Sequence, residues 1–182
     1  MTILINYYSR SGNNKLVAEE LASRLGADIE GINSKTKYSN LFGIFKMVIH
    51  GRRKKPSRLE LMKKNPAGYD LVVLCSPVWA GKLSAPARSY LQKYAKTIKK
   101  LAFLSVCGGG EDGNPDTSAE VKDLAGKTLI CEMELNTNLL LPEADRNDPR
   151  KVMAVHLKKQ DLEQAYKDLM KDIENKIKKI VR

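Results

Sequence analysis

The sequence predicts an α/β fold in which helices cover both faces of a mostly parallel sheet, giving three α/β/α layers. Apolar runs of strand length alternate with amphipathic stretches of helical spacing along the whole chain. Loops rich in Ser, Asn and Gly follow several of the apolar runs. No internal repeat or low-complexity linker interrupts the pattern, and 182 residues suffice for one substantial core. We therefore expect a single domain spanning residues 1–182.

Each element is justified by its own pattern. Val17 and Leu21 share one face of the first helix, which Gly26 ends. An apolar stripe on the last helix, expected to pack on the core, comprises Leu162, Tyr166, Leu169, Ile173, Ile177 and Ile180. The strands are expected at residues 2–8, 27–33, 69–76, 101–107 and 128–136, and further helices at about 13–25, 84–96 and 116–124.

Two stretches do not fit a minimal domain with these five strands. Residues 38–53 carry apolar side chains around most of a helix, leaving a polar stripe of Lys46, His50 and Arg53. Such a helix is buried on two sides or docks on a partner or membrane, and we favour packing in the core plus a homodimer contact. Residues 139–149 form a loop near the end of the fifth strand, where it can approach a ligand.

Composition indicates a protein of ordinary soluble type. Hydrophobic residues make up 42% of the chain and charged residues 29%. No apolar run approaches the roughly 20 residues of a membrane span, and we expect neither a transmembrane segment nor a signal peptide. Three widely spaced cysteines indicate reduced thiols and a cytoplasmic location.

The positive charge is concentrated in one segment. Residues 35–64 hold ten basic residues and one acid, a net charge of +9 out of +11 for the whole chain. We call residues 35–64 the basic segment. It predicts an acidic partner, an anionic cosubstrate or an anionic surface, and the alternative is a solvated connection.

Other functional signals are weak. Residues 125–128 read Ala-Gly-Lys-Thr, but Val121 stands where a P-loop needs its first glycine. His50 and His156 have no second metal ligand at suitable spacing, so no metal site is expected. The basic segment lacks interleaved aromatic residues and a nucleic-acid-binding module, so we expect no nucleic acid. No catalytic residue is proposed.

The first loop is the most informative feature for function. It runs from Ser9 to Asn14 between an apolar strand and a helix start, and it supplies hydroxyls, amides and the flexible Gly12. Free N–H groups and the positive end of the helix dipole point into such a loop, which suits a phosphate. Capping of the helix by the same residues is the alternative.

Two further loops strengthen the phosphate interpretation. Residues 76–81 read Ser-Pro-Val-Trp-Ala-Gly and hold the only Trp of the chain, and residues 107–110 read Cys-Gly-Gly-Gly. Each follows a predicted strand and precedes a predicted helix. The carboxyl ends of parallel strands share one sheet edge, so the three loops meet there. Together they predict a site for a phosphorylated, flat, aromatic ligand.

The three loops resemble those of the flavodoxin family over nearly the whole chain, which implies a flavodoxin-like sheet of strand order 2-1-3-4-5 and FMN as cofactor. The resemblance implies that side chains of Ser9, Ser11, Asn13 and Asn14, with the backbone of Arg10, Gly12 and Lys15, hold the phosphate. It places the ring beside Pro77, Val78, Trp79, Ala80 and Gly81, with Trp79 stacked on the ring or at its edge. It places Cys107, Gly108, Gly109 and Gly110 under the pyrimidine side.

The chain departs from the family at two places. Family loops usually carry Thr where Asn14 stands, and the third loop lacks a second ring-stacking aromatic residue. An open flavin face is therefore expected. The first function implied is an electron carrier between redox proteins. The alternatives are an NAD(P)H-dependent oxidoreductase of quinone-reductase type and a non-catalytic flavin-binding regulatory module.

Overall fold

The computed structural model describes residues 1–38, 41–109 and 114–181 of the chain. Within these residues the central sheet has five strands, all paired in parallel. Their spatial order is β2 (Asp28–Gly31), β1 (Ile3–Tyr7), β3 (Leu71–Ser76), β6 (Leu101–Cys107) and β7 (Leu129–Asn136). Counted along the chain, this order is 2-1-3-4-5, the flavodoxin-like order, as predicted.

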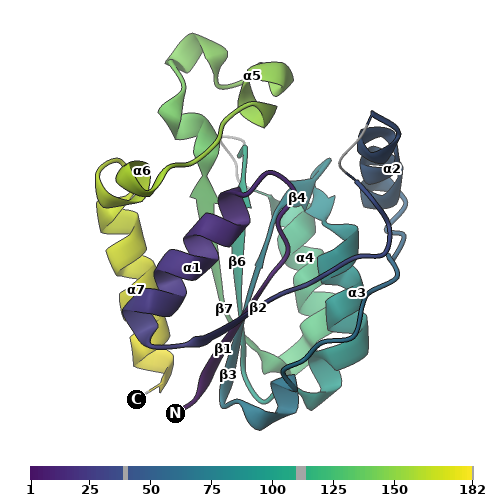
Figure 1. The fold of residues 1–182 in the computed structure, drawn as a ribbon, viewed down its shortest axis with the longest axis vertical. Helices are drawn as coiled ribbons and strands as arrows, with labels where there is room; N and C mark the ends of the chain where they lie inside the picture. The colour runs from purple at the N-terminus through teal and green to yellow at the C-terminus, as the bar shows by residue number, and fades with distance from the viewer. Residues whose placement is uncertain (39–40, 110–113, 182) are drawn as a thin grey trace.

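Helices cover both faces of this sheet (Figure 1). On one face α1 and α7 bury Val17, Leu21 and Ile173, and on the other α3 and α4 bury Tyr90 and Val121. Because β1, β3 and β6 are covered on both sides, they read as near-continuous apolar runs in the sequence. The helices are α1 (Asn13–Leu25), α2 (Leu41–Arg52), α3 (Ala85–Tyr94), α4 (Pro115–Ala125), α5 (Pro149–Met153), α6 (Lys159–Glu163) and α7 (Lys167–Val181).

Most predicted elements lie where the pattern placed them. Gly26 ends α1 in the left-handed conformation and its N–H donates to the carbonyl of Ala22, as expected of a glycine stop. Short 3₁₀ turns follow or precede several elements, at Pro66–Gly68, Ala95–Thr97, Gly126–Thr128, Thr137–Leu140 and Glu143–Asp145. In the part of the chain that is described, no helix is long and apolar enough to cross a membrane.

The prediction of one continuous last helix is wrong. The apolar stripe is divided between α6 and α7, because the chain turns at Gln164 and the N–H of Tyr166 donates to the carbonyl of Asp161, five residues back. The buried Tyr166 hydroxyl donates to the carbonyl of Asn136 at 2.7 Å, a bond to the end of β7. A tertiary contact therefore sets this break, and helical spacing alone cannot reveal it.

The second loop also contains a small hairpin that the sequence analysis did not predict. β4 (Val78–Trp79) and β5 (Lys82–Leu83) form an antiparallel hairpin at the carboxyl edge of the sheet. Its two-residue turn is Ala80 and Gly81, both with positive φ, at 51° and 74°. Positive φ at both turn residues is typical of the tight type I′ hairpin turn.

Candidate functional site

The carboxyl ends of β1, β3 and β6 surround a cavity of about 120 Å³. It is lined by nine of the residues predicted for the site: Arg10, Ser11, Asn13, Asn14, Pro77, Val78, Trp79, Cys107 and Gly108. Ser9, Gly12, Lys15, Ala80, Gly81 and Gly109 belong to the same three loops but do not line it. Gly110 lies outside the described residues.

The first loop has the features of an anion-binding turn. Gly12 has a φ of 98° and its N–H donates to the Ser9 hydroxyl at 3.0 Å, which closes the loop before α1. The first amides of α1, at Asn13, Asn14 and Lys15, have no acceptor within the helix. With the positive end of the helix dipole, these N–H groups can attract an anion.

The side chains of Asn13 and Asn14 are already paired inside the protein. Asn13 donates from Nδ2 to the carbonyl of Val155 and accepts at Oδ1 from the N–H of Leu157, both at 2.9 Å. Asn14 donates from Nδ2 to the carbonyl of Val106 at 2.9 Å. Their backbone amides, and not their side chains, are therefore the donors that this arrangement leaves for a ligand.

Trp79 is part of an aromatic cluster. Its side chain is 3% exposed, with the ring of Tyr38 at 4.8 Å and that of Tyr8 at 5.6 Å in an edge-on arrangement. Trp79 also lines the cavity. Most of the indole surface is therefore covered by other residues of the protein, and only a small part of it faces the cavity.

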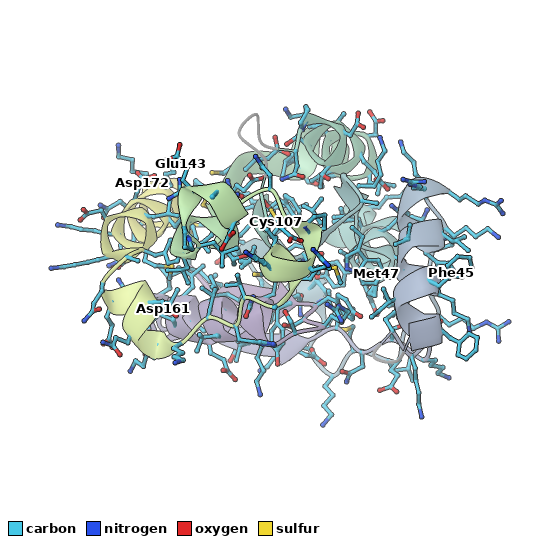
Figure 2. All side chains as sticks on the ribbon, turned by 90° about the horizontal axis from the view of Figure 1, so that it is seen from above. Phe45, Met47, Cys107, Glu143, Asp161 and Asp172 are labelled. Atoms are coloured by element: carbon cyan, nitrogen blue, oxygen red, sulfur yellow. The ribbon has the colours of Figure 1, made fainter. Side chains whose placement is uncertain are left out.

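Helix α2 closes one side of the cavity through Met47, which is 9% exposed. Gly51 allows the close approach, because a Cβ at this position would lie 2.6 Å from the carbonyl oxygen of Trp79. Figure 2 shows Met47 on the inner side of α2 and Phe45 on its outer side. The expected core-facing side of this helix is thus observed.

A buried arginine fixes the far end of α2. Arg88 is 1% exposed, forms an ion pair with Glu120 and donates to the carbonyls of His50, Lys55 and Leu83 at 3.2, 2.9 and 2.7 Å. Charged side chains can satisfy the last carbonyls of a helix in this way. Arg88 therefore joins the carboxyl end of α2 to the hairpin that carries Trp79.

The third loop packs against residues 137–158, for which the sequence predicted only a loop at residues 139–149. We call residues 137–158, between β7 and α6, the return segment. A Cβ at Gly108 would lie 2.1 Å from Cγ1 of Val152, so the return segment sits directly on the third loop. α5 lies above the carboxyl end of the sheet (Figure 1). The sequence did not predict six further cavity residues: Met47, Val106, Thr137, Val152, Met153 and Val155.

The return segment also reaches the first loop. Nδ1 of His156 lies 3.3 Å from the carbonyl oxygen of Ser11. We expected residues 139–149 to approach the ligand, but the cavity is lined by Val152, Met153 and Val155. These residues follow the start of α5, which Asp148 and Pro149 mark in the sequence. That Asp-Pro pair is the sequence signal for α5, but nothing in it shows where the helix packs.

Cys107 is not a reactive thiol. Burial, together with the nearby carboxylate of Glu134, raises the pKa of Cys107 to about 11. The thiol is therefore neutral near pH 7, and neutral thiols are poor nucleophiles. Cys107 serves the site as a small buried side chain.

Comparison with solved structures supports the fold. A flavoprotein from Lactobacillus acidophilus in complex with FMN superposes with a TM-score of 0.64 at 19% identity, covering 73% of this chain and 92% of that one. A protein named as a putative flavoprotein, from Bacteroides eggerthii, gives a TM-score of 0.60 at 18% identity, covering 85% of this chain and 99% of that one. A second protein of that name, from Bacteroides uniformis, gives a TM-score of 0.59 at 14% identity, covering 74% of this chain and 90% of that one. No protein-family model and no curated protein matches the sequence.

Proposed function

We propose that this protein binds FMN at the carboxyl edge of its sheet and carries electrons between redox partners. The observation that carries the proposal is the cavity at which the first loop, the hairpin loop and the third loop meet beside the amino end of α1. Ligands of open parallel sheets bind at this position, where the strand order reverses. The structural similarity to an FMN complex supports the same choice of cofactor.

The phosphate would bind at the first loop. The hydroxyls of Ser9 and Ser11 and the backbone amides of Asn13, Asn14 and Lys15 are its donors, and Arg10 adds a positive charge at the cavity. The Asn14 side chain would position this loop through its hydrogen bond to the carbonyl of Val106.

The ring would lie between the second and third loops. Pro77, Val78 and Trp79 supply one wall, and Cys107 and Gly108 supply the other. When bound, FMN supplies the redox chemistry, and the protein binds it, orients it and limits its contact with water. The cavity of about 120 Å³ is smaller than pockets that hold small molecules, which are about 300–1,000 Å³. Binding would therefore require the return segment to move outward.

The experiment that tests the proposal is titration of the purified apoprotein with FMN and with riboflavin. We expect one FMN per chain and much weaker riboflavin binding, because riboflavin lacks the phosphate. Ser11→Asp should weaken FMN binding by more than about 2 kcal/mol, because a carboxylate then faces the phosphate. Ser23→Asp is the matched control, since Ser23 is exposed further along α1. Equal affinities for FMN and riboflavin would contradict the assignment of the first loop.

A second candidate function is NAD(P)H-dependent reduction of an acceptor by the bound flavin. A hollow of about 250 Å³ adjoins the cavity and shares Arg10 with it; Ser9, Ser34, Thr36 and Lys37 also line it. These hydroxyl and cationic groups suit a phosphorylated cosubstrate. Anaerobic addition of NADPH separates the two functions: rapid bleaching of the flavin favours the reductase, and an unchanged spectrum favours the carrier.

The basic segment supplies the remaining proposal about partners. Because the net charge of this segment is +9, it would attract an acidic redox partner or an anionic surface and would repel a partner with a basic surface.

A further inference from the structure

The outward face of α2 combines exposed aromatic side chains with cations. Phe42 is 79% exposed and Phe45 is 67% exposed, and both are separated from the buried Met47 by the helix itself. Residues 42, 45 and 46 share one side of a helix of 3.6 residues per turn, so Phe42 lies one turn from Phe45 and Lys46. Phe45 points away from the body of the protein in Figure 2.

A hollow of about 570 Å³ lies beside this face. Phe42 and Lys46 line it from α2, and Lys35, Thr36, Lys37 and Arg58 line it from the neighbouring loops. Among the described residues, none of these four cations forms an ion pair with a carboxylate. Four unpaired cations around one exposed phenyl ring form a surface complementary to clustered negative charge.

We propose that this surface, made of Phe42, Phe45, Lys46, Lys35, Lys37 and Arg58, docks the protein on an anionic lipid bilayer. The phenyl rings would enter the boundary between headgroups and acyl chains, and the cations would bind the phosphates of the headgroups. Three of the four cations in the hollow are lysines, and lysine is depleted at protein–protein interfaces. Lysine is favoured beside lipid headgroups because its long stem packs on apolar surface while the ammonium group stays in water.

The inference extends the proposed function, since it names the anionic surface that the basic segment would meet. Met47 lines the cavity from the inner side of the helix whose outer side would contact the bilayer. A bound flavin would then lie one helix diameter from the membrane. The docking surface itself requires no cofactor, so the two proposals can fail separately.

The test is co-sedimentation of the full chain with vesicles. Vesicles of equal parts phosphatidylglycerol and phosphatidylcholine should bind the protein at low salt, and vesicles of phosphatidylcholine alone should not. Lys35→Glu with Lys37→Glu and Lys46→Glu should weaken binding about 100-fold or more, since each cation near the surface contributes about fivefold. Phe42→Ser with Phe45→Ser should weaken it about tenfold or more through loss of apolar insertion.

The matched control is Lys167→Glu with Lys171→Glu and Lys179→Glu. These lysines are exposed on α7, on the far side of the molecule from α2, and the triple variant changes the net charge by the same amount. It should retain most of the binding. FMN content, measured by absorbance on each variant, reports separately on the cofactor proposal.

Three results would overturn the docking proposal. Failure of the parent to sediment with the anionic vesicles would leave an acidic protein as the occupant. An equal loss of binding in the control triple variant and the α2 variant would mean general attraction by net charge. Binding of the double Phe variant at the level of the parent would exclude insertion of the rings.

Discussion

His50 is held neutral at the point where α2 meets the aromatic cluster. Its Nδ1 lies 3.0 Å from the hydroxyl of Tyr38, which can donate to a neutral imidazole. Burial lowers the pKa of His50, and the nearby charges of Lys55, Lys46 and Arg88 lower it further. The folded protein thus resists the proton that an unfolded chain would accept.

The lowered pKa of His50 makes the free energy of unfolding decrease as the pH falls. Stability from His50 is fully present above its ordinary pKa of 6.5 and is lost as the pH falls from there through the lower folded value. Urea unfolding midpoints should therefore drop between about pH 7 and about pH 5, and His50→Gln should reduce the drop. His156→Gln, at an exposed histidine, is the control. An equal drop in the parent and the His50 variant would assign the effect to other groups.

Arg88 is the second residue whose environment makes a sharp prediction. Arg88→Met leaves Glu120 buried without its cation and removes the hydrogen bonds that Arg88 donates to three backbone carbonyls. Loss of one partner of a buried pair costs about 3–5 kcal/mol of unfolding free energy. Adding Glu120→Leu to this variant should restore part of the loss, because the orphaned charge is removed. Denaturant unfolding of the two variants measures both effects, and equal stabilities would mean that Glu120 is not the source of the cost.

At the scale of the elements, the position of α2 depends on one glycine. An alanine in a helix usually gains up to about 1 kcal/mol over glycine. At Gly51, however, the added Cβ meets the Trp79 carbonyl oxygen at 2.6 Å. Gly51→Ala should instead lose about 1–3 kcal/mol of unfolding free energy through displacement of α2. Gly68→Ala, where nothing lies within 4 Å, should be tolerated, and the two variants are compared by thermal unfolding.

The elements also show what sequence reasoning can reach. The strands and α1 were predictable because each is specified by local periodicity and by its own end signals, such as Gly26. The packing of α2 and the return segment was not, because it depends on contacts between distant residues. Gly51 against Trp79 and Val152 against Gly108 leave no local pattern. The hydrogen bonds of the Asn13 side chain to residues 155 and 157 are equally invisible in the sequence, where Asn13 was predicted to contact the ligand.

At the scale of the whole molecule, the uneven charge affects stability as well as binding. Like charges of the basic segment repel one another, and salt screens that repulsion over about 8–10 Å. Raising the salt concentration from low to physiological should therefore stabilise the protein, by about 1 kcal/mol if several exposed pairs are relieved.

Reversing four of these charges checks the origin of the effect. Arg52→Glu, Arg53→Glu, Lys54→Glu and Lys55→Glu together should flatten the dependence of the urea midpoint on salt, because four reversals change the net charge of the basic segment by −8, from +9 to +1. All four residues are exposed, so the fold should persist. A quadruple variant with the salt dependence of the parent would place the repulsion elsewhere in the chain.

The two hydrogen bonds of Asn13 have a consequence for the rate and affinity of ligand uptake. They tie the return segment across the mouth of the first loop, where Val152 also rests on Gly108. If a cofactor must break these contacts to bind, its apparent affinity is the intrinsic affinity multiplied by the fraction of molecules in which the contacts are already broken. A bound cofactor would in turn favour the state with broken contacts by the same factor. If FMN binds as proposed, Asn13 would couple the occupancy of the site to the order of residues 155–157, more than 140 positions away in the chain.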